Sequence, residues 1–254
     1  MFRPRIIPVL LLRNKGLVKS IKFGNHRYIG DPINAVRIFN DLKADELVFL
    51  DILASKEKRT ISLDFIKDVG EEANMPFAVG GGINDIKFIK NILAAGAEKV
   101  ILNTIAAKNP EFVKQASDAF GSSTIVVCID VKKKFLGKEQ IWIYGGSKSI
   151  GMSPVEFSQL MEEKGAGEII IQSIERDGTM SGYDLQLIRK ISEAVSIPVV
   201  ALGGAGNLRH LQQAFTESYA NGLAAGSMFV YHGARNGILI NYPENKEILN
   251  LFAL

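Results

Sequence analysis

A repeat with a spacing of 122 residues is the feature that most constrains the fold of this chain. The segments that repeat are "DELVFLDI" with "GEIIIQSI", and "MPFAVGGGIND" with "IPVVALGGAGN". Both pairs share one offset, from Glu46 to Glu168 and from Pro76 to Pro198. Because this offset is close to half of the 254 residues, it predicts two related halves, at about 1–122 and 123–254.

Short β-rich runs alternate with helical patterns along the whole sequence. The predicted strands are 5–12, 46–52, 76–80, 98–103, 123–130, 168–174, 197–202 and 221–226. Most are continuous apolar runs, such as "STIVVCID", which are typical of parallel strands buried on both faces. Eight strands alternating with helices predict a (βα)8 TIM barrel in one domain, built from two (βα)4 halves. A doubly wound open sheet is the alternative, and the repeat favours the barrel.

Capping residues and glycines mark the predicted helix ends. Asp31, Asn109 and Ser153 each precede a proline, which suits the first turn of a helix. Glu156 adds a predicted capping box to Ser153. Glycines stand where three helices are expected to stop, at Gly96, Gly121 and Gly165.

Composition and charge argue against several classes of partner. The formal charge is +3 and no basic run interleaved with aromatic residues stands out, so no nucleic-acid partner is expected. Cys128 is the single cysteine, which rules out an intramolecular disulfide and suits a reducing cytoplasm. The apolar run at 6–12 is too short for a signal peptide or a membrane span. The three histidines have no ligand spacing, so we expect neither a metal nor another cofactor.

Repeated glycines follow the third and seventh predicted strands, and polar residues follow the fourth and eighth. Glycine lets backbone N–H groups approach an anion closely, and helix N-termini add positive potential. The pattern predicts one phosphate cradle in each half, facing each other across the barrel mouth, and a substrate with phosphates at both ends. A plain chain turn is the alternative for any one glycine. The predicted cradle residues are Gly81, Gly82, Asn103 and Thr104 in the first half, and Gly203, Gly204, Gly226 and Ser227 in the second.

The first predicted strand ends in three leucines, Leu10, Leu11 and Leu12. Active sites of (βα)8 barrels are built at the carboxyl ends of the strands, where an acid, a base or a polar group is expected. The strand is followed by the polar segment "RNKG", which we expect to be a loop.

Four segments closely resemble HisF, the cyclase subunit of imidazole glycerol phosphate synthase: "DELVFLDILASKEKR", "PFAVGGGI", "SIERDGTMSGYD" and "LGGAGN". The resemblance extends from Arg5 to about Phe229. It implies a barrel of two fused half-barrels that receives ammonia at its bottom from a glutaminase subunit, HisH. The ammonia would then reach a bis-phosphate ribulosyl substrate at the top, where an imidazole ring is closed.

The resemblance also assigns individual residues. The family's ammonia gate, a salt-bridged ring of one arginine, one lysine and two glutamates, is matched by Arg5, Glu46, Lys99 and Glu168. A purely structural salt-bridge layer is the alternative. Glu98 falls at an acidic contact with the glutaminase, and Asp177 and Gly178 match a phosphate-binding segment. Lys19 and Phe23 match a mobile loop over the site, for which a solvated loop is the alternative.

The family's general acid/base pair consists of aspartates at the ends of strands 1 and 5. Asp130 matches the second of these, whereas the first aligns with Leu11, so one acid position is lost. Loss of one general acid/base typically costs on the order of 10²–10⁴ in rate. Gln172 stands where the family has a small hydroxyl residue, and the tail from His232 to Phe252 departs from a charged helix.

These departures are similar to a HisF-like branch associated with bacterial surface polysaccharides, which implies ammonia supply to a separate ATP-dependent sugar amidotransferase. Three functions remain open at this point. The first is such an ammonia-conducting subunit, in which a phosphorylated small molecule is also a candidate ligand. The second is a working cyclase for histidine biosynthesis that relies on Asp130. The third is a non-catalytic scaffold that only activates the glutaminase.

Overall fold

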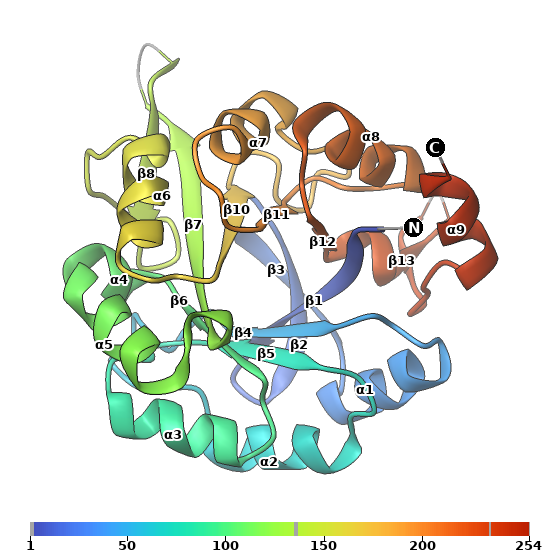
Figure 1. Ribbon diagram of the computed structural model, residues 1–254. Helices are drawn as coiled ribbons and strands as arrows, with labels where there is room; N and C mark the ends of the chain where they lie inside the picture. Colours follow the sequence, from blue (N-terminus) through green and yellow to red (C-terminus); the bar gives the residue numbers. More distant parts are fainter. Residues whose placement is uncertain (1–2, 135–136, 234, 254) are drawn as a thin grey trace.

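The computed structural model describes residues 3–134, 137–233 and 235–253. Eight parallel strands form a closed ring in it, with helices around the outside (Figure 1). The ring strands are β1 (Arg5–Arg13), β4 (Leu47–Asp51), β5 (Phe77–Gly80), β6 (Lys99–Leu102), β7 (Ile125–Lys133), β10 (Glu168–Ser173), β11 (Val199–Leu202) and β12 (Gly222–Ala225). Pairing of β1 with β12, Arg5 opposite Gly222, closes the ring. The predicted (βα)8 barrel is confirmed, and the open sheet is excluded.

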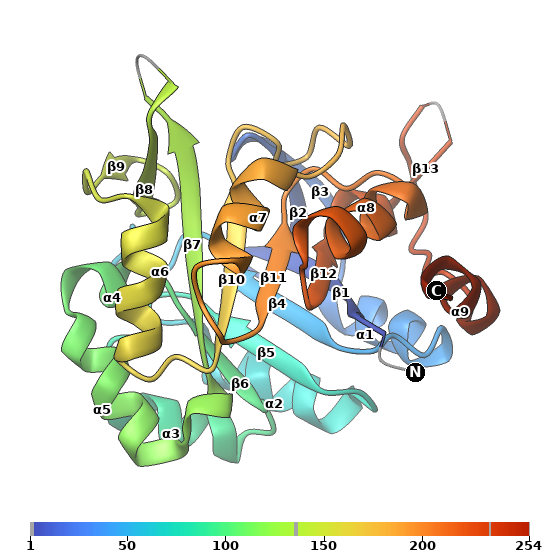
Figure 2. The ribbon, with the colours of Figure 1, turned by 45° about the horizontal axis from the view of Figure 1, so that its top comes forward.

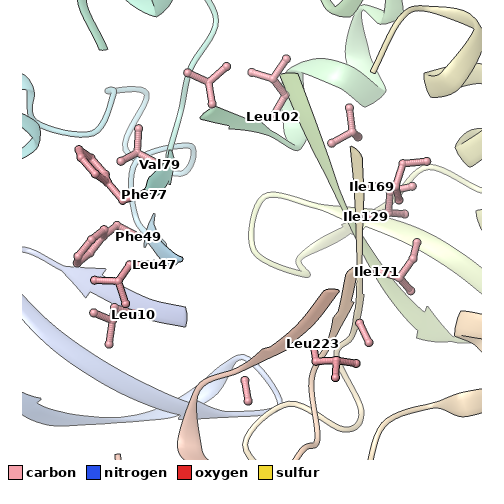
Figure 3. Packing of buried hydrophobic residues seen from close by; sticks show 14 of the residues in the cluster. Leu10, Leu47, Phe49, Phe77, Val79, Leu102, Ile129, Ile169, Ile171 and Leu223 are labelled. Carbon is pink, nitrogen blue, oxygen red and sulfur yellow. The ribbon is translucent and has the colours of Figure 1, made fainter. Parts of the chain in front are cut away.

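The outer layer consists of amphipathic helices that pack on the outward face of the strands. They are α1 (Pro32–Asp41), α2 (Leu63–Glu72), α3 (Ile86–Ala94), α4 (Thr104–Lys108), α5 (Pro110–Phe120), α6 (Pro154–Glu163), α7 (Leu185–Ser192) and α8 (Leu208–Ser218). Figure 3 shows buried strand residues such as Leu10, Phe49 and Ile129 pointing outward from the ring toward this layer. Side chains of alternate residues point inward, because successive residues of a strand face opposite sides.

Helix boundaries largely follow the capping signals. The Asp31 side chain accepts the N–H of Asn34 at the start of α1. Helix α6 begins at Pro154, but Ser153 makes no capping hydrogen bond, so the predicted capping box is wrong. Asn109 likewise precedes α5 without a side-chain cap. The predicted stops are confirmed: Gly96, Gly121 and Gly165 follow α3, α5 and α6 with φ of 106°, 86° and 88°.

Two hairpins extend from the carboxyl ends of ring strands. The polar segment "RNKG" forms the turn between β1 and β2 (Gly16–Ile21), so the predicted loop is confirmed. Strand β2 then pairs with β3 (Gly24–Gly30) in a hairpin that the sequence did not predict. Strand β8 (Glu139–Ile143) returns antiparallel to β7 and carries Trp142, followed by the short β9 (Lys148–Ser149). Figure 2 shows the β7–β8 hairpin projecting on the side to which the β7 arrowhead points, away from the N-terminus.

The C-terminal segment runs from the barrel face where β12 ends to the face where β1 begins. A small hairpin of β13 (Tyr231–His232) and β14 (Gly237–Ile238) precedes α9 (Asn245–Phe252), which lies near the N-terminus in Figure 1. Between them, the buried Tyr242 hydroxyl donates to the Ile6 carbonyl at 3.0 Å and accepts the Asp45 N–H at 3.2 Å. The tail therefore fastens the start of β1 to the turn that precedes β4.

Within the residues that the structure describes, no helix combines the length and apolar character needed to cross a bilayer.

Candidate functional site

A cavity of about 720 Å³ opens at the carboxyl ends of β1, β4, β5, β6, β7 and β10; we call it the mouth cavity. Leu11 of β1, Asp130 of β7 and Gln172 of β10 all line it, so the structure brings together the three positions that the sequence singled out. Gly81, Gly82, Asn103 and Thr104, the predicted first cradle, line the same cavity.

Asp130 is the ionisable group at the base of the mouth cavity. Its side chain is buried, and Oδ2 accepts a hydrogen bond from Asn103 Nδ2 at 3.2 Å. Burial raises its pKa to about 7, because desolvation outweighs the hydrogen bonds from Asn103 and Cys128 that favour the anion. A carboxyl group with this pKa can donate or accept a proton near neutral pH.

Leu11 gives the mouth cavity an apolar wall where a second acid would stand. Asp51, also in this cavity, does not replace that acid, because Arg59 binds both of its oxygens, at 2.5 and 3.1 Å. One Asp51 oxygen also accepts the N–H groups of Leu53 and Ala54. Asp51 therefore orders the loop after β4, and among the carboxyl groups of this cavity only Asp130 is free of an ion pair with a described residue.

The glycines of the first cradle are required by close packing. Gly82 has a φ of 66°, which favours glycine, and a Cβ there would overlap the Arg59 carbonyl oxygen. Its own N–H makes no hydrogen bond to any residue that the structure describes. The contact with the Arg59 loop alone explains why position 82 is glycine.

The second cradle has the same construction but much less space. Gly204, offset from Gly82 by the repeat, has a φ of 110°, and a Cβ there would overlap the Gly182 carbonyl oxygen. Gly203, Gly204, Gly226 and Ser227 line a separate cavity of about 30 Å³, which we call the small cavity. Leu11, Ser20 and Gln172 line both cavities and form the wall between them.

Asp177 holds the β2–β3 hairpin. Its Oδ2 accepts the Ser20 hydroxyl at 2.7 Å and the Phe23 N–H at 3.1 Å, and its carbonyl accepts the Lys22 N–H at 3.0 Å. Burial raises the pKa of Asp177, and these hydrogen bonds offset part of that effect. Gly178 is in contact with the Ser20 backbone, so closely that a Cβ would overlap it. Asp177 and Gly178 therefore have a structural role, which is an alternative to the phosphate binding predicted for them.

Lys19 is buried on strand β2, so the solvated-loop alternative is wrong. Its Nζ donates to the Val9 carbonyl at 2.6 Å, and a Cβ on Gly226 would lie 2.7 Å from Nζ. Burial lowers the pKa of Lys19 to about 8, and attraction to Asp177 opposes this effect. Phe23, the other residue matched to the mobile loop, lies at the turn of the β2–β3 hairpin and lines the mouth cavity.

Four charged residues close the opposite end of the barrel. Arg5 donates to Glu46 and, at 2.8 Å, to Glu168; Lys99 donates to Glu168 at 2.8 Å and to Glu46 at 3.3 Å. The charges alternate, so each ion has two opposite neighbours. Burial raises the pKa of Glu46 despite both cations. Burial also lowers the pKa of Arg5, but attraction to the two glutamates outweighs it and the net shift is upward.

Apolar side chains fill the barrel between this ring and the mouth. They are Ile7, Val9, Val48, Ala78, Ile101, Val126, Cys128, Ile170, Val200, Leu202 and Ala224, with Leu11 and Leu50 at the mouth. Cys128 belongs to this apolar core, but it also has a polar neighbour: its Sγ lies 3.8 Å from Asp130 Oδ1. Burial raises the pKa of this thiol, so it stays protonated and can donate to Asp130.

Several cationic residues at the mouth were missed from the sequence. Lys56, Lys58 and Arg59, from the loop after β4, line the mouth cavity together with Lys108 of α4. The signal was available in the "KEKR" run, which lies in the loop after β4. In the part of the chain that the structure describes, no group of three or more His, Cys, Asp or Glu side chains could hold a metal ion.

Comparison with known proteins agrees with this geometry. The sequence matches a family model described as "Histidine biosynthesis protein" over residues 5–235. It is 46% identical over 253 residues to "Putative imidazole glycerol phosphate synthase subunit HisF" of Leptospira borgpetersenii, covering 99% of this chain and 100% of that protein. It is 42% identical over 232 residues to "Imidazole glycerol phosphate synthase subunit HisF" of Alkaliphilus metalliredigens, covering 91% and 92%.

A third relative, "Putative imidazole glycerol phosphate synthase subunit hisF2" of Pseudomonas aeruginosa, is 42% identical over 244 residues, which cover 96% of this chain and 97% of the relative. The matches therefore span nearly the whole barrel, including the ring and both cradles. The chain belongs to the histidine biosynthesis protein family and is a HisF-type (βα)8 barrel.

Proposed function

We propose that this chain is the ammonia-receiving barrel subunit of a glutamine amidotransferase complex. A HisH-like glutaminase would dock at the N-terminal face, and the ammonia would serve amidination of a bacterial surface-polysaccharide sugar by an ATP-dependent amidotransferase. The observation that carries the proposal is the ring of Arg5, Glu46, Lys99 and Glu168 below an apolar interior.

The interior discriminates between ammonia and ammonium. An apolar interior imposes a large desolvation penalty on a cation and a much smaller one on neutral ammonia. The ring would be the passage point, since its side chains can separate while keeping one partner each. Exposed Glu98, next to Lys99, would offer an acidic contact to the glutaminase at the same face.

The departures at the mouth support a function other than ring closure. Leu11 leaves Asp130 as one acid/base group where the cyclase chemistry uses two. Gln172 places a neutral amide at the same level of the barrel. Together they favour supply of ammonia to another enzyme over chemistry within this barrel.

A working cyclase in histidine biosynthesis is the second candidate. One observation favours it: Asp130 has a pKa of about 7 at the base of a large cavity, which suits proton transfer. A scaffold that only activates the glutaminase is a third possibility. A scaffold would not require the apolar interior to conduct ammonia. The reconstitution experiment below therefore distinguishes a scaffold from the proposed function.

Reconstitution with the glutaminase and the sugar amidotransferase tests the proposal. Glutamine should support amidination only when this chain is present, whereas a high concentration of free ammonia should support it without the chain. Glu98→Lys should weaken the complex with the glutaminase by charge reversal at the docking face. Glu175→Lys is the matched control, because Glu175 is exposed after β10 at the opposite face.

Two results would contradict the proposal. One is glutamine-dependent amidination at full rate in the absence of this chain. The other is glutaminase activation by this chain without any transfer of ammonia to the sugar, which would support the scaffold.

A further inference from the structure

The charged ring at the N-terminal face is not supported by ladder pairing between β1 and β4. The pairing of these two strands begins at Val9 opposite Val48. Pro8, directly before that pair, has no N–H and cannot donate a further hydrogen bond toward the start of β4. On its other edge, β1 pairs with β12 from Arg5 onward. Arg5 and Glu46 therefore lie on neighbouring segments that the ladder does not join at their level.

Side chains bridge this edge of the barrel instead. The Ile6 N–H donates to Asp45 Oδ2 at 2.9 Å, and the Ile6 carbonyl accepts the Tyr242 hydroxyl at 3.0 Å. The same hydroxyl accepts the Asp45 N–H at 3.2 Å. Tyr242 is thus inserted between a carbonyl of β1 and an N–H of the turn before β4, where a parallel ladder would join the two backbones directly. We call these contacts the tyrosine bridge.

Arg3 and burial maintain the tyrosine bridge. Arg3 donates to both Asp45 oxygens, at 2.7 and 2.8 Å. Burial raises the pKa of Asp45, but the hydrogen bonds from Arg3 and Ile6 outweigh it, so the net shift is downward and the carboxylate stays charged. Burial also raises the pKa of Tyr242, so its hydroxyl keeps the proton that it donates to Ile6.

Tyr242 belongs to neither of the strands that it joins. Its ring packs against Phe229 with the centroids 5.6 Å apart, and the neighbouring Asn241 N–H donates to the Phe229 carbonyl at 3.0 Å. Phe229 is buried and follows β12. The C-terminal tail is therefore anchored on the segment after β12, and it holds β1 and β4 together from a third part of the chain.

The tyrosine bridge adjoins one side of the charged ring. Ile6 follows Arg5, and Asp45 precedes Glu46, so the bridge holds the residues next to these two ions. Arg5 and Glu46 are also the only two ring ions on strands that are neighbours in the barrel, because at least one strand separates every other pair. A change in the spacing of β1 and β4 would therefore change the separation of Arg5 and Glu46 without breaking a ladder hydrogen bond at their level.

We propose that Tyr242 is a positioning residue for the charged ring. By holding Ile6 and Asp45 together, it sets the separation of Arg5 and Glu46, and the C-terminal tail thereby determines how tightly the N-terminal face is closed. The inference rests on the proposed function, because it concerns the residues through which the ammonia would enter.

Hydrogen exchange of the purified chain, resolved by NMR at single amides, tests this role. Tyr242→Phe removes the hydroxyl and keeps the aromatic ring. The informative amide is that of Leu47, which donates to the Pro76 carbonyl at 3.0 Å and does not contact Tyr242. Its exchange should become at least about tenfold faster relative to the control amide below, because the start of β4 loses its link to β1.

The repeat supplies the control amide. Ile169 lies at the equivalent position of the second half, beside Glu168, and its N–H donates to the Pro198 carbonyl at 3.0 Å. The ratio of the exchange rates of Leu47 and Ile169 removes any change in global stability, which accelerates both amides equally.

Tyr183→Phe is the matched control variant. Tyr183 is also buried, and its hydroxyl donates to the Ala224 carbonyl at 3.0 Å. The variant removes an equivalent hydrogen bond away from the charged ring. It should leave the ratio of exchange rates of Leu47 and Ile169 at its native value.

The reconstituted complex provides a second readout, the number of glutamine molecules hydrolysed per sugar amidinated. Tyr242→Phe should raise this number, because ammonia escapes to solvent past a loosened ring. Tyr183→Phe should leave it unchanged. A loss of stability alone would lower the amount of folded complex and reduce both rates together, so it would not change their ratio.

Equal exchange ratios in Tyr242→Phe and Tyr183→Phe would overturn the inference. An unchanged number of glutamines per amidination in Tyr242→Phe, despite faster exchange at Leu47, would also overturn it. A native complex that transfers no ammonia would instead count against the proposed function. The exchange measurement needs only the purified chain, so it would still decide whether Tyr242 positions the ring.

Discussion

The sequence predicted the position of Asp130, whereas the environment that sets its pKa depends on the fold. Its position at the end of a barrel strand follows from the sequence, but its pKa depends on burial between β6 and β10 and on Asn103 and Cys128. Leu11, across the same cavity, removes the partner that a two-acid mechanism uses.

The raised pKa of Asp130 predicts a specific pH dependence of stability. Below about pH 4 the carboxyl is protonated in both the folded and unfolded states. Between about pH 4 and 7 the folded protein retains the proton that the unfolded chain has released, so the free energy of unfolding falls as the pH rises. Each unit of pKa shift corresponds to about 1.4 kcal/mol.

Asp130→Asn should remove this dependence, since an amide does not titrate. Urea unfolding at pH 5 and pH 8 should show a smaller pH-dependent loss in the variant than in the native chain. Asp68→Asn, at an exposed position on α2, is the control and should leave the profile unchanged. A native chain with equal stability at both pH values would contradict the account of Asp130.

At the scale of elements, the β2–β3 hairpin is the clearest difference from the sequence-based expectation. The segment from Gly16 to Gly30 has charged and polar residues that suggest a solvated loop. Its order comes from Asp177, which is 157 residues away from Ser20, and from close packing on Gly178. Such distant contacts have no periodic signature in the sequence, unlike the apolar runs that located the ring strands.

The helix ends show the same limit of sequence-based prediction. The sequence pattern located the starts of α1 and α6 correctly, because proline fixes the first turn in each case. It assigned a capping box to Ser153 that does not form, and it missed the capping box of Glu244 and Glu247 in α9. Side-chain orientation at a cap depends on neighbouring elements, so residue type alone did not determine it.

Removal of the Asp177 carboxylate should release the hairpin. We expect Asp177→Ala to lower the free energy of unfolding by about 2 kcal/mol and to speed amide hydrogen exchange at residues 16–24. Asp184→Ala removes an N-cap of α7 and should cost about 1 kcal/mol without affecting exchange in the hairpin. Equal exchange rates in the two variants would show that Asp177 does not hold the hairpin.

At the scale of the whole molecule, the two ends of the barrel have different designs. The N-terminal face is closed by alternating charges, the interior is apolar, and the carboxyl face opens into unequal cavities. The repeat and the matching positions of the four charges made the fold and the ring predictable. The inequality of the cavities was not predictable, because it depends on how the loops pack over nearly equivalent glycines.

The four charged residues of the ring should be strongly coupled in their contributions to the free energy of unfolding. Lys99→Met removes one cation and leaves Glu46 and Glu168 with Arg5 alone, so we expect a loss of about 3 kcal/mol at pH 8. The loss should be smaller at pH 5, where the uncompensated carboxyl groups can take up a proton more readily. Adding Glu168→Gln to Lys99→Met should restore part of the stability, as measured by urea unfolding. A loss no greater than that of Lys114→Met, at an exposed position, would contradict the coupling.

The central claim is that this barrel passes ammonia but lacks the proton-transfer pair of a cyclase. The most direct measurement is cyclisation of the bis-phosphate ribulosyl substrate at high ammonia concentration, followed by loss of absorbance, for the native chain and Leu11→Asp. The account predicts no turnover by the native chain, because Leu11 leaves Asp130 without a second acid/base group in the mouth cavity. Rescue by Leu11→Asp would show that the carboxylate missing at position 11 is the main chemical loss, whereas turnover by the native chain near cyclase rates would contradict the central claim.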